Sequence, residues 1–349
     1  MSRSRTRGPR SLAALMLAVV VVASGCSSGS KGAGSDGTKS KSLVVYSGQH
    51  EDLTQALAAA FEKESGITLE VRSGDDAGLV NQIIEEGDRS KADVVLTEEP
   101  GPIAQLDAAG LLAKVDSSTL AKVDSRFSPK SGNWLAWAAR VRVMLYNPNL
   151  ISEDELPKSV LELSDPEWKG RFAYAPSGAF VTTVNYLIDS IGEDKTLEWL
   201  KGIKANGVNE QKNGKVRDSV EAGQHEFGLA NHYYWYILAR EKGGEDALQS
   251  RVHYVDGKDA GGLVLASGAG VLKSSKNQET AQQFMAWLAD RDGGQQIVAK
   301  DTPQYPTVDG VTSSYDIRPL SELDPPEFDQ GSLSEGAKAK ELMVKAGLI

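Results

Sequence analysis

Four short polar segments of this chain carry side chains that could bind a ligand. Two of them directly follow apolar runs: GQH at residues 48–50 comes after LVVYS, and the glutamates at 98–99 come after ADVVLT. The other two are PSGA at 176–179 and NHYYWY at 231–236. Their donors are imidazole nitrogen, carboxylate and phenol oxygens, and backbone N–H groups. This chemistry suits a cation or a small polar solute.

His50 and Glu98 both stand just past the end of an apolar run. Ligands of open α/β sheets bind beyond the carboxyl ends of the strands, so we expect His50 and Glu98 to face one crevice. The alternative is that His50 only caps the helix starting at Glu51 and that both glutamates are solvated. Adjacent residues of an extended chain point to opposite faces, so Glu98 and Glu99 are a poor acid–base pair. Only one of them is expected to serve the site.

The serine and glycine at 177–178 precede a helix-like run at 180–189. Free backbone N–H groups and the positive end of the helix dipole make such a turn a cradle for an anion. An ordinary serine cap is the alternative. No Gly-Lys-Ser/Thr follows, so the turn is not a phosphate-binding P-loop.

Tyr233 and Tyr234 form the sharpest local feature. Consecutive side chains diverge in a strand and lie about 100° apart on a helix, so both phenols can meet at one point only near a loop-to-helix junction. The alternative is a packed aromatic cluster with hydrogen-bonded hydroxyls.

The elements that position these segments alternate between strand and helix, and an uninterrupted apolar strand indicates a parallel sheet buried on both faces. The predicted class is therefore α/β. In the first part of the chain strands are expected at 43–46, 67–71 and 92–97, and helices at 51–66 and 78–87. In the second part strands are expected at 140–148, 171–176 and 263–272, and helices at 180–192, 197–207, 279–290 and 335–347.

Length and composition set the class of protein. At 349 residues the chain is longer than one compact core usually requires, so two lobes or two domains are expected. A mean hydropathy of −0.32 with 25% charged residues argues against a multi-span membrane protein and against wholesale disorder. The formal net charge of −10 would repel a phosphate backbone, so nucleic acid is not an expected partner.

The N-terminus predicts an exported, lipid-anchored protein. Four arginines precede an apolar run from Leu12 to Ala23, which is too short to span a membrane and has the length of a signal-peptide core. The following ASGC resembles a bacterial lipobox, with Ala23 where Leu is usual and Cys26 as the lipidated residue. An ordinary cleaved secretory signal is the alternative. Removal of residues 1–25 would lower the formal net charge from −10 to −14, since it takes away four arginines and no acid.

Cys26 is the only cysteine, so the rest of the chain has no disulfide, zinc–thiolate site or thiol nucleophile. Ten of the sixteen residues from 27 to 42 are Ser or Gly, which predicts a flexible tether. The folded part should begin near Leu43. His225 and His253 lie outside the four segments and are expected to be surface or packing residues.

Taken together, the segments resemble the ferric-ion-binding periplasmic proteins that serve ABC transporters. The resemblance runs from about Leu43 to the C-terminus and is carried, in order, by LVVYSGQH, EEGDRSKADVVLTEE, PSGAF, KNGKVRDSVEAG, ANHYYWY and GGLVLASGAGVLKSS. It implies a bilobal type II binding-protein fold with two α/β lobes and two hinge strands at about 139–146 and 263–270. The implied divisions are a signal peptide at 1–25, lipidated Cys and tether at 26–42, lobe 1 at 43–140 plus about 268–316, and lobe 2 at 141–267 plus about 317–349.

The resemblance also implies the site. The iron ligands would be His50, Glu98, Tyr233 and Tyr234, and a phosphate or carbonate would rest on Ser177, Gly178 and Ala179 near Asn213 and Asn231. Two phenolates and a carboxylate would balance the charge of Fe(III), and two octahedral positions would stay open for the anion. Glu99 departs from the family pattern, where Gln is common, and its carboxylate would repel phosphate.

The expected function is therefore that of a monomeric, non-enzymatic, extracytoplasmic lipoprotein that captures Fe(III) and delivers it to an ABC permease. One alternative keeps the fold but exchanges the cargo for a phosphonate, a polyamine or thiamine, although such solutes need no paired phenolates. A secreted hydrolase using Glu98 or Glu99 is a further alternative, weakened by the lack of a second placed carboxylate or a Ser-His-Asp arrangement.

Overall fold

Apolar runs in the first hundred residues form a parallel α/β unit. The computed structural model describes residues 41–127 and 129–349, which belong to one folded unit. Strand β1 pairs in parallel with both β2 and β3, as the uninterrupted apolar run of β3 predicted, but β3 pairs antiparallel with β9 on its other side, so the sheet is mixed. Gly66 ends α1 in the left-handed conformation that glycine adopts without steric cost. The elements are β1 (Ser42–Ser47), α1 (Glu51–Ser65), β2 (Thr68–Ser73), α2 (Asp76–Glu86), β3 (Val94–Thr97) and α3 (Pro100–Ala108).

Two long strands join this unit to the rest of the chain. Strand β4 (Leu135–Tyr146) is buried along all twelve residues, and β9 (Val264–Val271) is buried along all eight. The first half of β4 pairs antiparallel with β9, and its second half pairs antiparallel with β7 (Phe227–Asn231). Strand β9 in turn pairs antiparallel with β3. Both strands match the predicted hinge segments, although β4 begins five residues before the expected start at Arg140.

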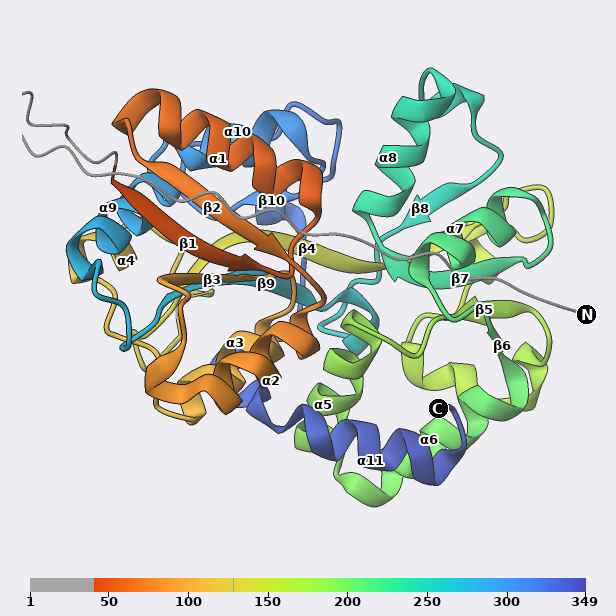
Figure 1. Ribbon diagram of the computed structural model, residues 1–349. Helices are drawn as coiled ribbons and strands as arrows, with labels where there is room; N and C mark the ends of the chain where they lie inside the picture. The colour runs from red at the N-terminus through yellow and green to blue at the C-terminus, as the bar shows by residue number, and fades with distance from the viewer. Residues whose placement is uncertain (1–40, 128) are drawn as a thin grey trace, which may run out of the picture. The chain divides into compact units, whose positions relative to one another are not determined.

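A second α/β unit follows β4. In it β5 pairs in parallel with β6 and with β7, so the full strand order is β2-β1-β3-β9-β4-β7-β5-β6 (Figure 1). Its elements are β5 (Phe172–Tyr174), α5 (Ala179–Ile191), α6 (Glu193–Asn206), β6 (Val208–Asn209), α7 (Asn213–Glu221), β7 and α8 (Tyr233–Lys242). The short strands β8 (Arg251–His253) and β10 (Tyr305–Pro306) pair with β4 outside this order.

The last part of the chain returns to both units. Helix α9 (Gln278–Leu288) packs on the first unit, where Phe61 of α1 meets Phe284 with ring centroids 5.0 Å apart. Helix α11 (Gly336–Ala346) packs against α5 and α6 of the second unit. The remaining helices are α4 (Ser117–Leu120) and α10 (Gly294–Asp301). We call the first unit with α9 and α10 lobe 1, and the second unit with α11 lobe 2.

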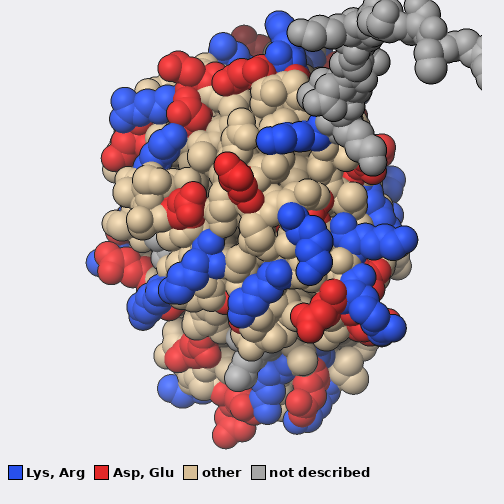
Figure 2. Space-filling model, turned by 60° about the vertical axis from the view of Figure 1, so that its left-hand side comes forward, with Lys and Arg blue, Asp and Glu red and all other residues tan. Residues whose placement is uncertain are grey.

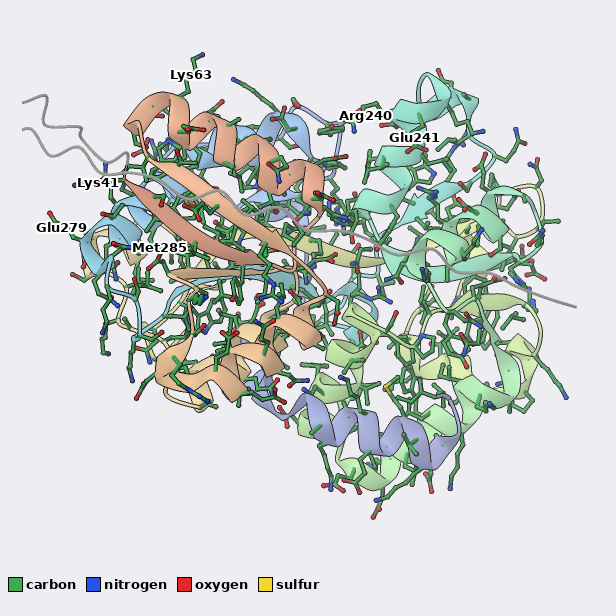
Figure 3. All side chains as sticks on the ribbon, viewed as in Figure 1. Lys41, Lys63, Arg240, Glu241, Glu279 and Met285 are labelled. Carbon is green, nitrogen blue, oxygen red and sulfur yellow. The ribbon has the colours of Figure 1, made fainter. Side chains whose placement is uncertain are left out.

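Two large apolar clusters fill the interior, and the first extends from lobe 1 along β4 to α8 of lobe 2. One large buried cluster gathers β1, β3, α1 and α9, and another gathers β5, α5, α6 and α11. Figure 3 shows Met285 directed into the first of these, whereas Lys63 and Glu279 point outward. The result is the predicted arrangement of two α/β lobes joined by two hinge strands.

The surface and the termini add two observations. Acidic and basic side chains are interspersed on the face drawn in Figure 2, so the negative net charge does not mark out a site there. Across residues 41–127 and 129–349 no helix is both long and apolar enough to cross a membrane. The predicted signal peptide, Cys26 and the tether up to residue 40 lie outside the described residues.

Candidate metal centre

The two tyrosines lie where β7 turns into α8. Tyr233 is the first residue of α8, and its ring stacks on that of Tyr234 with centroids 4.4 Å apart. Both phenols therefore lie together at a strand-to-helix junction, as their position in sequence required. Tyr233 is almost fully buried, at 1% exposure.

Glu98 and His50 reach the tyrosines from lobe 1. The Tyr233 hydroxyl donates a hydrogen bond of 2.7 Å to Glu98 Oε1, and His50 Nε2 lies 3.7 Å from the same oxygen. The His50 ring also meets Tyr233 edge-on, with centroids 5.7 Å apart. Although His50 is the N-cap residue of α1, its side chain makes no capping hydrogen bond. The four predicted ligands thus form one cluster that joins both lobes.

The cluster holds its phenols in the protonated form. Burial raises the pKa of Tyr233 well above its ordinary value, and Glu98 and Tyr234 add to the shift. Burial also raises the pKa of Tyr234, with a further contribution from Glu98. A neutral phenol can donate the hydrogen bond to Glu98, whereas a phenolate beside that carboxylate would be repelled.

The predicted anion segment forms the N-terminus of α5. Gly178 is the N-cap residue with φ 54°, and no side chain caps this helix. Ser177 instead directs its hydroxyl to the backbone oxygen of Gln211 at 3.4 Å, so the serine-cap alternative is wrong. Backbone N–H groups near Ala179 remain at the positive end of the α5 dipole.

Asn213 and Asn231 flank the tyrosines. Asn213 starts α7, and its Oδ1 is buried without a hydrogen-bond partner among the described residues. Asn231 ends β7, and its Oδ1 accepts from Nη1 of Arg142 at 2.9 Å. Burial lowers the pKa of Arg142 to about 10, which still leaves it cationic at neutral pH.

Glu98 and Glu99 serve different partners, as their adjacency predicted. The Glu99 carboxylate lies 2.8 Å from Nη2 of the fully buried Arg140 and accepts from the Thr182 hydroxyl at 3.2 Å. It therefore links lobe 1 to hinge strand β4 and to α5. Because Arg140 compensates its charge, Glu99 repels a nearby anion less than the sequence alone suggested.

Asp76 is a polar residue of this region that sequence reasoning missed. Its carboxylate accepts the backbone N–H of Glu98 at 3.2 Å and that of Glu99 at 2.9 Å. Burial raises its pKa to about 7. Nothing in the local sequence GDDAG marked Asp76, whereas the alternation of arginines in RVRVMLY could have drawn attention to Arg140 and Arg142.

The remaining histidines have other roles. His232 is fully buried, accepts the Val141 N–H at Nδ1 over 3.3 Å and stacks on Tyr305. Burial lowers its pKa to about 3, so it is neutral and ties the start of α8 to β4. His225 lies 3.2 Å from Glu210 and His253 lies 2.9 Å from Glu153.

The search for metal-ligand groups limits which side chains could bind a metal. Within the described ranges, no group of three or more His, Cys, Asp or Glu side chains could hold a metal ion, so a metal at this cluster would need the tyrosines.

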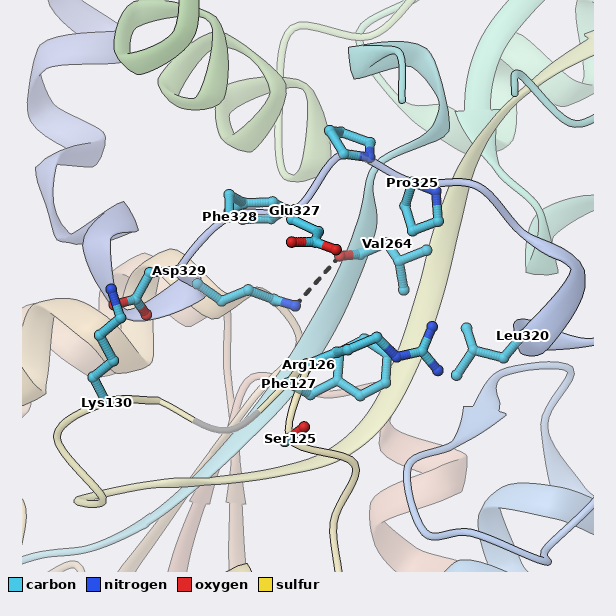
Figure 4. A pocket seen from close by; sticks show the side chains of 12 residues that line it. Ser125, Arg126, Phe127, Lys130, Val264, Leu320, Pro325, Glu327, Phe328 and Asp329 are labelled. Carbon is cyan, nitrogen blue, oxygen red and sulfur yellow. Dashed lines mark hydrogen bonds and ion pairs between the residues drawn. The ribbon is translucent and has the colours of Figure 1, made fainter. Parts of the chain in front are cut away.

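A separate hollow lies beside Val264 and the segment 325–330, where Gln330 Nε2 donates to the Val264 oxygen (Figure 4). It contains none of the predicted site residues.

Comparison with known proteins shows the family to which this chain belongs. Residues 47–295 match the model of the bacterial extracellular solute-binding proteins. The chain belongs to this family. It is 40% identical to the Fe(3+)-binding periplasmic protein of Serratia marcescens over 308 residues, which cover 88% of this chain and 90% of that one. Solute-binding proteins of this kind are a non-enzymatic class, and an extracytoplasmic location fits the family.

Solved structures agree with the sequence match. Iron-bound HitA from Pseudomonas aeruginosa is 42% identical and aligns with a TM-score of 0.83, covering 88% of this chain and 99% of that chain. The Trichodesmium protein in complex with iron and citrate is 28% identical, with a TM-score of 0.77 and coverage of 88% and 99%. The bilobal type II binding-protein fold is thereby confirmed for this family member.

Proposed function

We propose that this protein captures Fe(III) between its lobes with His50, Glu98, Tyr233 and Tyr234. The observation that carries the proposal is a cluster of four donor side chains. The Tyr233 hydroxyl lies 2.7 Å and His50 Nε2 3.7 Å from the same Glu98 oxygen, and the Tyr234 ring stacks on that of Tyr233. The relatives named for ferric iron support the choice of metal.

The donor set suits the charge and hardness of Fe(III). Two phenolates and one carboxylate carry three negative charges, and imidazole adds a neutral fourth donor. Hard cations prefer oxygen ligands, and a bound trivalent ion stabilises the phenolate forms that the metal-free site disfavours. Iron would replace the proton now shared between Tyr233 and Glu98.

A synergistic anion, phosphate or carbonate, would complete the coordination at Ser177, Gly178 and Ala179, near Asn213 and Asn231. The positive end of α5 and the cationic Arg142 beside Asn231 support an anionic ligand at this position. The citrate of the Trichodesmium protein is a third chemical choice for this position.

Capture would be coupled to closure of the lobes, because His50 and Glu98 come from lobe 1 and both tyrosines from lobe 2. Hinge closure around a ligand is the behaviour for which periplasmic binding proteins are known. The lobe boundaries proposed are 43–140 with about 268–316, and 141–267 with about 317–349. The protein would act as a monomer and without enzymatic activity.

The proposed setting is the outer face of the cell membrane, with lipidated Cys26 as anchor and residues 27–42 as tether. An ABC permease would receive the iron. A Ser/Gly-rich tether of this length would have an r.m.s. reach of roughly 20–24 Å, which would let the folded part work near the membrane surface.

The test is reconstitution of the metal-stripped protein with ferric nitrilotriacetate, followed by metal analysis and a visible spectrum. One ferric ion per chain and a phenolate-to-iron charge-transfer band are expected. Tyr234→Phe should weaken iron binding by at least about 100-fold, since loss of even an outer partner of a metal ligand typically costs 10–100-fold.

The matched control is Tyr236→Phe on the same helix, whose hydroxyl pairs with that of Tyr254 at 3.2 Å and not with the cluster. It should bind iron like the unaltered protein. A protein that stays colourless and takes up no ferric ion would refute the proposal. Equal losses in both variants would favour a purely structural aromatic cluster.

A further inference from the structure

We propose that Asp76 is a positioning residue that holds Glu98 in the orientation that binds the ferric ion, an inference that rests on the proposed function. Asp76 is the first residue of α2 and does not belong to the predicted ligand set. Its two carboxylate oxygens divide between two consecutive backbone donors: Oδ1 accepts from Glu98 and Oδ2 from Glu99, at 3.2 and 2.9 Å.

These hydrogen bonds act on the turn that carries Glu98. The turn is held from a second side by Ser267 of hinge strand β9, whose hydroxyl donates to the Glu98 backbone oxygen at 3.1 Å. Because the N–H and the carbonyl of Glu98 are both hydrogen-bonded, the two peptide units that flank its Cα have little freedom to rotate. Its side chain is thereby aimed at Tyr233, where Oε1 accepts the 2.7 Å hydrogen bond. Such support of a ligand by its outer partners is what keeps a metal site in its productive geometry.

The neighbouring turn leaves room for this carboxylate. A Cβ atom on Gly48 would lie 1.8 Å from Asp76 Oδ1 and 3.0 Å from its Cα, so no side chain fits there while Asp76 keeps its place. The Gly48 N–H in turn donates to the Leu96 oxygen at 2.9 Å, at the end of β3. Asp76 therefore packs between the turn that leads to His50 and the turn that carries Glu98.

Positioning differs from a simple charge effect. If Asp76 only added negative charge near the cation, Asp76→Glu would bind iron normally and Asp76→Asn would bind it less well, whatever residue stands at position 98. If Asp76 holds the turn, both substitutions should weaken binding, because Glu is one methylene too long and the Asn amide presents a donor to one of the two N–H groups.

The experiment measures ferric affinity by competition with citrate for the mature protein and its variants. We expect Asp76→Asn and Asp76→Glu each to bind iron about 10- to 100-fold more weakly, with the charge-transfer band unchanged at saturating iron because both phenolates remain. Asp75→Asn is the matched control: Asp75 caps α2 by accepting the Gly78 N–H at 2.9 Å, and Asn is an equally good cap. It should bind like the unaltered protein.

A double-mutant cycle with Glu98→Gln decides the inference. In that background Asp76→Asn should cost no more than about twofold, since sites that act through one another are not additive. The positioning role would be overturned if Asp76→Asn still weakened ferric affinity 10- to 100-fold in the Glu98→Gln background. It would also be overturned if Asp76→Asn by itself bound iron normally. If Asp76→Asn does not fold, Gly48→Ala tests the same contact by displacing Asp76, and normal binding by it would also overturn the inference. Absence of ferric binding by the unaltered protein would instead remove the proposed function itself.

Discussion

At the scale of single residues, the proposed ferric site holds protons on its two tyrosines, and a bound cation would have to replace them. The phenol of Tyr233 donates to Glu98, and burial raises the pKa of Tyr233 and of Tyr234. In the metal-free protein both tyrosines are neutral at pH 7. A ferric ion that binds both as phenolates has to release their protons to solvent.

This protonation predicts a pH dependence. Because two protons leave for each ion bound, the apparent affinity should rise with pH by up to about 100-fold per unit below the tyrosine pKa values. The measurement is the proton yield on adding ferric nitrilotriacetate to weakly buffered protein, corrected for protons taken up by the chelator. Two protons per iron are expected, and one for Tyr234→Phe. A yield of zero would mean that neither tyrosine ligates as phenolate.

At the scale of elements, the site is made from turns that follow parallel strands. In lobe 1 His50 follows β1 and Glu98 follows β3, and in lobe 2 Tyr233 follows β7 and Asn213 follows β6. Parallel strands end on the same edge of their sheet, so their turns meet there. The helices that begin in these turns direct their positive ends toward the cluster, which favours anionic ligands.

The hinge strands depend on close packing against the helices that cover them. A Cβ on Gly268 of β9 would lie 2.4 Å from Cγ2 of Ile103 in α3. We therefore expect Gly268→Ala to destabilise the metal-free protein by about 1–3 kcal/mol through overpacking. Gly214→Ala in α7 meets nothing within 4 Å and should instead stabilise it by up to about 1 kcal/mol. Urea unfolding measures both, and equal effects would contradict the packing argument.

At the scale of the whole molecule, the lobes meet through contacts that also build the site. The Glu98–Tyr233 hydrogen bond joins lobe 1 to α8, and Glu99 joins it to Arg140 and to Thr182 of α5. Strand β4 passes from one lobe to the other and pairs with β9 and β7 along its length. If Fe(III) binds as proposed, the same residues would carry both binding and closure, as the hinge mechanism requires.

The proposed membrane attachment belongs to this scale too. Cys26→Ala should release the protein from the membrane fraction and leave ferric affinity unchanged, because residues 27–42 separate the anchor from the folded lobes. Fractionation of cells followed by detection of the protein in the medium or wash checks this. Unchanged membrane association of Cys26→Ala would contradict the lipid anchor.

The sequence pattern by itself predicted the α/β class and many of the strands and helices to within a few residues, and the family resemblance added the two hinge segments. Hydrophobic periodicity and turn residues are local signals, and so is the placement of His50 and Glu98 after apolar strands. The motifs also named the four side chains that the structure brings together.

Only the tertiary structure decided how these side chains are held. Asp76, Arg140 and Thr182 are separated along the chain from the glutamates they contact by between 22 and 83 positions. No local pattern encodes such a pairing. The division of labour between Glu98 and Glu99 follows from which partners the fold places on each side of their turn. Burial likewise sets the protonation of the tyrosines and of His232, because the cost of charge depends on surroundings that exist only after the lobes have packed.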